Sequence, residues 1–385
     1  MFSELIGDER PISWVLQFWP VLLVSFTVSL IATSLCKKIA IRFGIVDKPD
    51  DLVKTHKGPI AYLGGLGMMA GLAAGIMISI GVYSIHEGSY RVVSMLFGIL
   101  AGAVIACGIG LVDDLMEIKP FQKVLGQLIA ALMLVMVGIV PNLEMFIKPF
   151  DIYVPHQIIL ALEVIMVFVF VLGATNSLNL LDGLDGLCGG VTAIITVGML
   201  LLAVHLATWS FSDTGDPVRI IVCFALIGCV CGFLPFNRYP AKIFMGDAGS
   251  MLLGFVAAAI MILFGENNPR WLMASIVLFG LPILDTAVAL VRRLINRHPL
   301  FVSDRGHIYD QMIDRGMSLK KTVLICYLLA LLYAVIGLLM SQIRTRYAAV
   351  VYVIVFTVSG LVVWKKGYLK MEGLRGAVKK KTDDA

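Results

Sequence analysis

Two adjacent acids end one of the apolar runs of this sequence. Asp113 and Asp114 follow Gly110-Leu-Val. Neighbouring carboxylates repel each other unless a cation or a shared proton lies between them. Acids at the C-terminal end of a helix are also opposed by the helix dipole. The pair is therefore a candidate for binding a cation or handling a proton, and the alternative is a solvated helix end.

A second acidic segment repeats at steps of three residues. Asn179, Asp182 and Asp185 would project in roughly one direction if the segment were helical. The segment holds no Lys or Arg, so nothing nearby in the sequence neutralises its carboxylates. Gly183 and Gly186 would let the backbone approach a ligand closely. We interpret this segment as part of a catalytic site, and the alternative is a turn built from Asp and Asn.

A third segment ends at Asp247, directly before another apolar run, and also holds Asn237, Lys242 and Phe244. The N-terminus of a helix attracts phosphate. Magnesium is usually bound by one or two carboxylates together with substrate oxygens and waters. Asp247 is thus a candidate ligand for a magnesium ion that is itself bound to a diphosphate. The alternative is a helix N-cap, a position that favours Asp.

Basic residues that could bind an anionic ligand lie in three further places. Arg305 and His307 flank Gly306 in the long basic loop 292–321, and an arginine can grip phosphate with two parallel hydrogen bonds. Lys123 directly precedes the apolar run 124–141, and His56 lies in the basic loop before the run 60–83. The alternative for these bases is that they anchor the chain at a lipid surface.

Asp285 lies within an apolar run, near one of its ends. An ionisable residue inside a membrane is a functional candidate by default. The alternative is an internal ion pair with Arg292 or Arg293.

Composition indicates that a membrane must position these segments. The chain is 59% hydrophobic and 15% charged, against about 45–50% apolar and about 25% charged residues in soluble domains. Mean hydropathy is +0.92. A spanning helix needs about 20 apolar residues. We predict an all-α polytopic membrane protein with about eleven transmembrane helices, forming one domain over residues 1–370 with a basic tail at 371–385. The runs are 14–36, 60–83, 92–112, 124–141, 158–178, 187–208, 218–236, 249–265, 271–291, 322–343 and 346–364.

The distribution of Lys and Arg predicts the orientation. With the N-terminus outside, 24 of the 31 Lys and Arg fall on the inner side, as expected from the excess of these residues in cytoplasmic loops. The C-terminus is then cytoplasmic, and its basic tail would lie against anionic lipid. All the acidic segments described above reach the inner face, whereas the outer segments hold only scattered acids. This asymmetry suits an enzyme at the cytoplasmic interface better than a transporter, whose polar residues lie near the bilayer midplane.

Together, and in this order, the four segments resemble the polyprenyl-phosphate N-acetylhexosamine-1-phosphate transferase family, over about residues 44–316. The resemblance implies transfer of a sugar 1-phosphate from a UDP-sugar to polyprenyl phosphate, with release of UMP. It implies a magnesium cofactor, with manganese as a substitute, at Asp247 and the nearby Asn179. The strings that carry the resemblance are VDD, NSLNLLDGLDG, NRYPAKIFMGDAGS and DRGH.

The resemblance also implies roles for single residues. Asp113 and Asp114 match the paired acids that deprotonate or orient the lipid phosphate, and Asp182 and Asp185 match acids that line the nucleotide and metal site. His307 matches the first histidine of the family's histidine motif. Phe244 matches an aromatic residue placed against uracil, and Asn237 and Lys242 match neighbouring site residues.

The sequence departs from the family after His307. The family usually has further histidines there, whereas this chain has Tyr309 and Asp310. Asp304-Arg305-Gly306 before His307 and the expected eleventh span resemble the GlcNAc branch, so UDP-GlcNAc is the first expected donor. The alternative within the family is phospho-MurNAc-pentapeptide translocase activity.

The expected partners are a UDP-sugar, polyprenyl phosphate and the bilayer, with no nucleic acid, and a homodimer is left open. The expected location is the bacterial cytoplasmic (inner) membrane, with the active site on the cytoplasmic face. The alternatives in other classes are a secondary transporter and a non-catalytic membrane scaffold.

Overall fold

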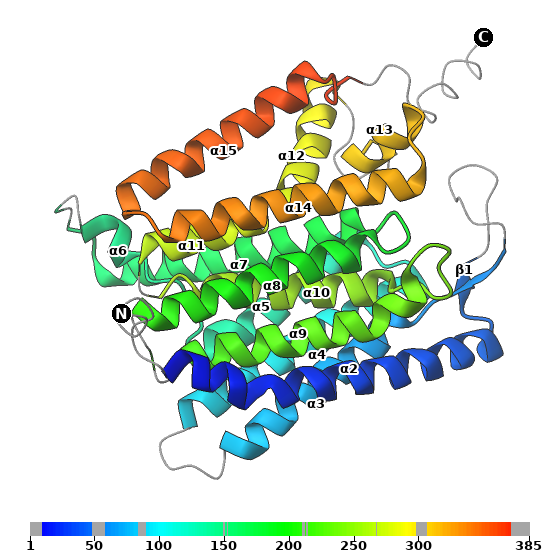
Figure 1. Cartoon of the computed structure of the whole chain (residues 1–385), viewed down its shortest axis with the longest axis horizontal. Helices are drawn as coiled ribbons and strands as arrows, with labels where there is room; N and C mark the ends of the chain where they lie inside the picture. The colour runs from blue at the N-terminus through cyan, green and yellow to red at the C-terminus, as the bar shows by residue number, and fades with distance from the viewer. Residues whose placement is uncertain are drawn as a thin grey trace.

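The computed structural model describes residues 10–47, 58–83, 90–148, 151, 153–209, 212, 215–266, 268–297 and 306–370. In these ranges the chain is almost entirely helical, and its long helices lie side by side along the long axis of the molecule (Figure 1). A two-stranded antiparallel sheet joins Val46 to Ala61 and Asp47 to Ile60. The elements are α2 (Arg10–Phe43), β1 (Val46–Asp47), β2 (Ile60–Ala61), α3 (Gly64–Tyr83), α4 (Tyr90–Met116), α5 (Pro120–Met136), α6 (Glu144–Ile147), α7 (His156–Leu181), α8 (Leu187–Trp209), α9 (Gly215–Asn237), α10 (Gly246–Leu263), α11 (Pro269–Leu278), α12 (Gly280–Ile295), α13 (Ile308–Asp314), α14 (Leu319–Ser341) and α15 (Thr345–Lys365).

The expectation of a polytopic all-helical membrane protein is confirmed. Within the described ranges, nine helices are long and apolar enough to cross a membrane, and the bent pair α11 and α12 would make ten. Each of the eleven expected runs coincides with a helix or with this pair. The fourth run became α5, which has only 17 residues and is shorter than the others. The count of eleven therefore depends on α5 and stays a prediction.

Helix α10 forms the centre of the bundle, where it packs against α3, α4, α7 and α9. Of the 18 residues of α10, 94% are buried, whereas 17% of the residues in the apolar stretch of the peripheral α15 are buried. Glycines allow this close packing, because small residues let helix backbones approach each other. A Cβ added at Gly254 of α10 would lie 2.6 Å from the carbonyl oxygen of Ala174 in α7. A Cβ added at Gly65 of α3 would lie 2.8 Å from the carbonyl carbon of Ala248.

The helix ends that carry the expected site residues gather at one end of the bundle. These are the C-terminal ends of α4, α7 and α9 and the N-terminal ends of α5, α8 and α10. In Figure 1 this end is on the right, next to β1 and α13, whereas α6 and the start of α2 lie at the other end. Because successive long helices run in opposite directions, segments far apart in sequence meet there.

The ninth apolar run does not form one straight helix. It is broken between α11 and α12, which meet at 69°. Pro282 contributes to the break, because proline has no N–H to donate to the preceding turn and its ring clashes with that turn. Helix α12 has a polar face that includes the buried Asp285 and an apolar face whose Leu294 and Ile295 are exposed.

Candidate functional site

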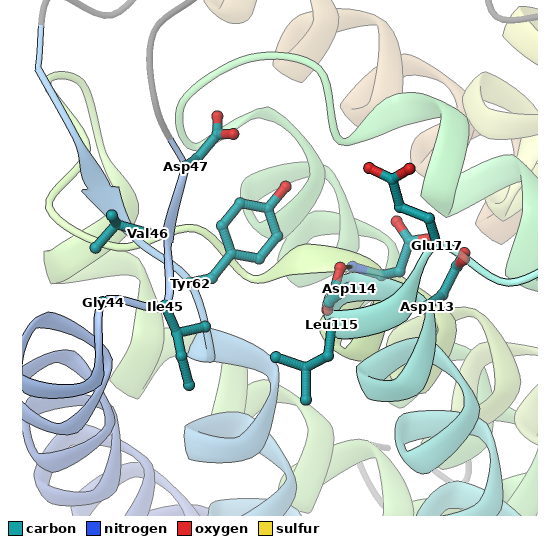
Figure 2. Close-up of a pocket in the computed structure, with 10 residues that line it drawn as sticks. Gly44, Ile45, Val46, Asp47, Tyr62, Asp113, Asp114, Leu115 and Glu117 are labelled. Carbon is teal, nitrogen blue, oxygen red and sulfur yellow. Dashed lines mark hydrogen bonds between the residues drawn. The ribbon is translucent and has the colours of Figure 1, made fainter.

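A pocket of about 580 Å³ opens at the end of the bundle where these helix ends gather. One wall is the segment Gly44–Asp47 with Tyr62, and the opposite wall is the end of α4, with Asp113, Asp114, Leu115 and Glu117. Asp247 at the start of α10 completes the lining. In Figure 2, Tyr62 and Asp47 extend from one side toward the acids at the end of α4. The pocket is therefore rich in carboxylates from three separate parts of the chain.

Lys123 joins the residues that the sequence suggested as ligands. Its ammonium lies 2.9 Å from Asp113 Oδ2 and 3.4 Å from Asn179 Oδ1, and it also contacts Asp247 Oδ2. The Asn179 amide in turn donates to Asp247 Oδ1 at 2.7 Å and to Ser250 Oγ at 3.0 Å. Side chains from α4, α7 and α10 thus point their oxygen atoms at the one positive charge that α5 supplies.

Asp114 has different contacts from its neighbour Asp113. Its Oδ1 accepts from the backbone N–H of Asp247 at 2.7 Å, and its Oδ2 accepts from that of Ala248 at 3.0 Å. The first N–H groups of a helix have no partner within the helix, and a carboxylate that accepts from them stabilises the helix start. Asp114 therefore acts as a cap for α10, supplied by another helix. The catalytic role expected for it stays a prediction.

The loop after α7 places two further acids near this cluster. Asp185 Oδ2 accepts from the backbone N–H of Ala241 at 2.9 Å. Burial raises the pKa of Asp182 well above its ordinary value, and the nearby carboxylates of Asp247, Asp114 and Asp185 raise it further. A bound cation would reverse this effect, because opposite charge favours the ionised form.

Tyr62 is a pocket residue that the sequence did not reveal. Burial raises the pKa of its hydroxyl, as do Asp114, Asp47 and further acids around it, so it stays a neutral donor among carboxylates. Tyr62 and Asp47 come from the segments joined by the β1–β2 pair, and no periodicity in the sequence marks either of them. Glu117 was missed as well, although it lies only three residues after Asp114.

The donor set fits magnesium. In the described part of the chain, no three His, Cys, Asp or Glu side chains are arranged around one point as a complete metal site. Magnesium does not need such a cage, because it usually takes one or two carboxylates and completes its shell with water and phosphate oxygens. Asp113, Asp247 and Asn179 each place a side-chain oxygen atom at the position of one ammonium group.

The residues of the third segment have less direct positions. Asn237 is buried and bridges two loops, since its side chain accepts from the Gly186 N–H and donates to the Ile243 carbonyl, both at 3.1 Å. Lys242 is exposed. Phe244 packs edge-on against Tyr62, with ring centroids 6.0 Å apart, behind the pocket wall. None of the three lines the pocket.

His307 does not line the pocket. Its Nδ1 is 2.8 Å from Asp285 Oδ2, and its ring stacks on that of Tyr309. The Tyr309 hydroxyl donates to the carbonyl of Leu180, next to Asn179. Asp285 therefore contacts a candidate site residue, and its functional role stays a prediction. Arg305, His56 and the basic tail 371–385 lie outside the described residues.

The opposite end of the bundle also holds a cluster of charged residues, whereas the sequence suggested only scattered acids there. Asp216 and Arg219 form a fully buried ion pair at 2.8 Å, and Glu266 lies 3.3 Å from the same guanidinium. A second pocket of about 430 Å³ lies there. Because Arg219 neutralises these acids, we assign them a structural role.

The fold and the site define a polytopic membrane protein with a carboxylate-lined pocket at one end of its bundle. Residues 96–265 match the family model described as glycosyl transferase family 4. The chain is 31% identical to the probable undecaprenyl-phosphate N-acetylglucosaminyl 1-phosphate transferase of Bacillus subtilis (strain 168), over 95% of this chain and 94% of that protein. At this similarity over nearly the full length, the chain belongs to glycosyl transferase family 4, and the resemblance seen in its sequence motifs is confirmed.

Two further relatives carry similar names. The chain is 30% identical to the decaprenyl-phosphate N-acetylglucosaminephosphotransferase of Mycobacterium tuberculosis (strain ATCC 25618 / H37Rv), over 80% of this chain and 79% of that protein. It is 28% identical to the undecaprenyl-phosphate alpha-N-acetylglucosaminyl 1-phosphate transferase of Escherichia coli (strain K12), over 79% of this chain and 78% of that protein. The family model covers Asp113, Lys123, Asn179, Asp182 and Asp247, and it ends before His307.

Proposed function

We propose that this chain transfers N-acetylglucosamine 1-phosphate from a UDP-sugar to a polyprenyl phosphate in the same bilayer, with release of UMP. The observation that carries the proposal is the meeting of Asp113, Asn179 and Asp247 at the Lys123 ammonium, beside a pocket at one end of a membrane bundle. The three relatives support it, since their names specify N-acetylglucosamine phosphate transfer and an undecaprenyl- or decaprenyl-phosphate.

The chemistry is an in-line displacement at phosphorus. An oxygen of the lipid phosphate attacks the β-phosphorus of the UDP-sugar and forms a new P–O bond. The bond from that phosphorus to the bridging oxygen breaks, and its electron pair leaves on UMP. Such transfers depend on positioning and charge neutralisation more than on covalent help from the protein. Because the second pKa of a phosphate is about 6, the acceptor needs little base catalysis, and Asp113 acts mainly by orienting it.

Asp247 and Asn179 would hold magnesium, or manganese in its place, with Asp182 and Asp185 close by. When bound, the metal neutralises charge on the diphosphate. Lys123 would supply a second positive charge next to the metal. Its contacts with two carboxylates hold the ammonium where the reacting phosphates must lie.

The anionic donor also needs cations at its other side. Arg305 and His307 bind its phosphates, with His56 as a further basic group. Phe244, Asn237 and Lys242 lie toward the nucleotide end. The contacts of Phe244 with Tyr62 support this placement, because Tyr62 itself lines the pocket.

The reacting end of the bundle faces the cytoplasm in this proposal. The chain crosses the bilayer eleven times when α5 and the bent pair are each counted as one span, with the N-terminus outside and the C-terminus inside. The bias of 24 to 7 in Lys and Arg supports this orientation. Bacterial relatives support the cytoplasmic (inner) membrane. Green fluorescent protein fused to the C-terminus should fluoresce, and alkaline phosphatase fused there should be inactive; the opposite pair of results would reverse the orientation.

The test of the activity uses the protein in lipid nanodiscs with undecaprenyl phosphate, MgCl2 and a panel of donors. UDP-GlcNAc should give UMP and a lipid-linked sugar diphosphate in equal amounts. UDP-GalNAc and UDP-MurNAc-pentapeptide test the other donors, and turnover only with the latter would favour the translocase alternative. Release of no UMP with any donor would refute the proposal, and flux of a UDP-sugar into sealed vesicles would favour a transporter.

A matched pair of variants tests the site. Asp247→Asn should lower turnover by about 100-fold or more, in line with the loss of one charge-stabilising group from an active site. Asp151→Asn makes the same chemical change beside α6, at the opposite end of the bundle, and should leave turnover unchanged. Full activity of Asp247→Asn would remove the metal assignment.

A further inference from the structure

We infer that Asp285 and Tyr309 are positioning residues that hold the His307 ring in place against the loop between α7 and α8. The inference rests on the proposed function, in which His307 contacts the donor. None of the three side chains lines the pocket. The proposed function places only His307 against the donor, so Asp285 and Tyr309 would act through His307.

Asp285 fixes His307 from the side of α12. Its Oδ2 lies 2.8 Å from His307 Nδ1, and its Oδ1 accepts from the backbone N–H of Ile308 at 2.7 Å. Asp285 is 1% exposed and His307 is 5% exposed. An ionised carboxylate only accepts hydrogen bonds, so Nδ1 is the donating ring nitrogen. One side chain thereby sets both the tautomer of the ring and the start of α13.

Tyr309 fixes the same ring from the other side. The two rings are nearly parallel, at 9°, with centroids 5.5 Å apart. The Tyr309 hydroxyl donates to the carbonyl of Leu180 at 2.8 Å. This carbonyl belongs to the last turn of α7, where carbonyls have no partner within the helix. Gly183 makes room for the ring, because an added Cβ there would lie 2.7 Å from Tyr309 Cε2. Tyr309 therefore ties His307 to the loop that carries Asp182.

The loop is a firm anchor, because other contacts fix it independently of Tyr309. The Tyr327 hydroxyl of α14 donates to the carbonyl of Gly186 at 2.6 Å. Asn237 accepts from the N–H of Gly186, and Asp185 accepts from the N–H of Ala241. Loss of the Tyr309 hydroxyl should consequently leave the loop in place and loosen only His307.

The test compares kcat/KM for the UDP-sugar, measured as UMP release in nanodiscs. Tyr309→Phe keeps the stacked ring and removes only the bond to Leu180, and it should lower kcat/KM about tenfold, as expected for one lost hydrogen bond. The change should appear in KM for the UDP-sugar and not in KM for the polyprenyl phosphate. Tyr333→Phe is the matched control, because it removes a tyrosine hydroxyl that bonds Ser359 between α14 and α15. This control should keep wild-type kcat/KM.

A double-mutant cycle tests whether the effect passes through His307. In a His307→Gln background, Tyr309→Phe and Asp285→Asn should each have little further effect on kcat/KM. Multiplying effects would overturn the inference, as would a wild-type kcat/KM for Tyr309→Phe in an otherwise active enzyme. A wild-type protein that releases no UMP with any donor would instead overturn the proposed function, and the role of His307 with it.

Discussion

Gly110 lies where α4 passes the first turn of α10, and an alanine there should separate the two halves of the site. A Cβ at this position would lie 2.5 Å from the backbone nitrogen of Ala248. The atoms in the way belong to the backbone of Asp247 and Ala248, so no side-chain rotation can make room. Non-bonded atoms prefer about 3.5–4.0 Å, so the helices must move apart by about 1 Å.

The displacement acts on the contacts that assemble the site. Asp114, one turn further along α4, holds the N–H groups of Asp247 and Ala248 at 2.7 and 3.0 Å. Asp113 shares Lys123 with Asp247 across the same gap. A misplacement of about 1 Å in a catalytic geometry can cost about 100-fold in rate. We therefore expect Gly110→Ala to lower kcat for UMP release about 100-fold while the protein still inserts and purifies.

The control is Gly108→Ala, which makes the same change two residues earlier on α4. None of the described atoms lies within 4 Å of a Cβ added there. Turnover should match that of the wild type, measured side by side in nanodiscs at saturating UDP-GlcNAc and undecaprenyl phosphate. Wild-type turnover for Gly110→Ala, or an equal loss in both variants, would show that the close approach of α4 and α10 does not set the rate.

Three further predictions concern stability. Asp114→Asn replaces one of the two oxygens that cap α10. It should lower the thermal unfolding midpoint in detergent, since a typical hydrogen bond contributes about 0.5–1.5 kcal/mol. An unchanged midpoint would exclude the capping role. Lys123→Met leaves the carboxylates of Asp113 and Asp247 without their shared ammonium, so its midpoint should fall and be largely recovered by MgCl2; no response to MgCl2 would contradict the cation site. The raised pKa of Asp182 means that its contribution to stability is present at low pH and lost as the pH rises through the folded-state pKa. Asp182→Asn should therefore unfold at the same or a higher temperature than the wild type in magnesium-free buffer at pH 8 while losing turnover, and a lower midpoint at pH 8 would contradict the raised pKa.

Hydropathy predicted the helices well, because a bilayer sets their minimum length and excludes charge from their middle. The expected runs 158–178 and 187–208 became His156–Leu181 and Leu187–Trp209. The run 271–291 shows the limit of the method. Mean hydropathy reports how apolar a segment is and does not report whether the helix is straight. The 69° bend between α11 and α12 was therefore not predicted, although Pro282 lies in the first turn of α12.

The residues that form the site could be predicted from the sequence better than the contacts that each of them makes. Asp113 is marked in the sequence by its neighbour Asp114, Asn179 by its three-residue spacing from Asp182, and Asp247 by its position before an apolar run. The structure brings all three to Lys123. Which side chain caps a helix and which faces the pocket depends on how each helix is rotated about its axis. Sequence spacing does not fix that rotation between helices, so the cap formed by Asp114 emerged only from the structure.

The bend between α11 and α12 exposes part of α12 to the surrounding lipid or detergent, which can therefore affect the site that this helix supports. Leu294 and Ile295 are more than 60% exposed on α12, so surrounding acyl chains or detergent tails complete the packing of this helix. The same helix carries Asp285, which holds His307. Bilayer thickness and detergent choice should therefore alter how well the histidine is aligned, and kinetic constants from micelles and from native-like lipid need not agree.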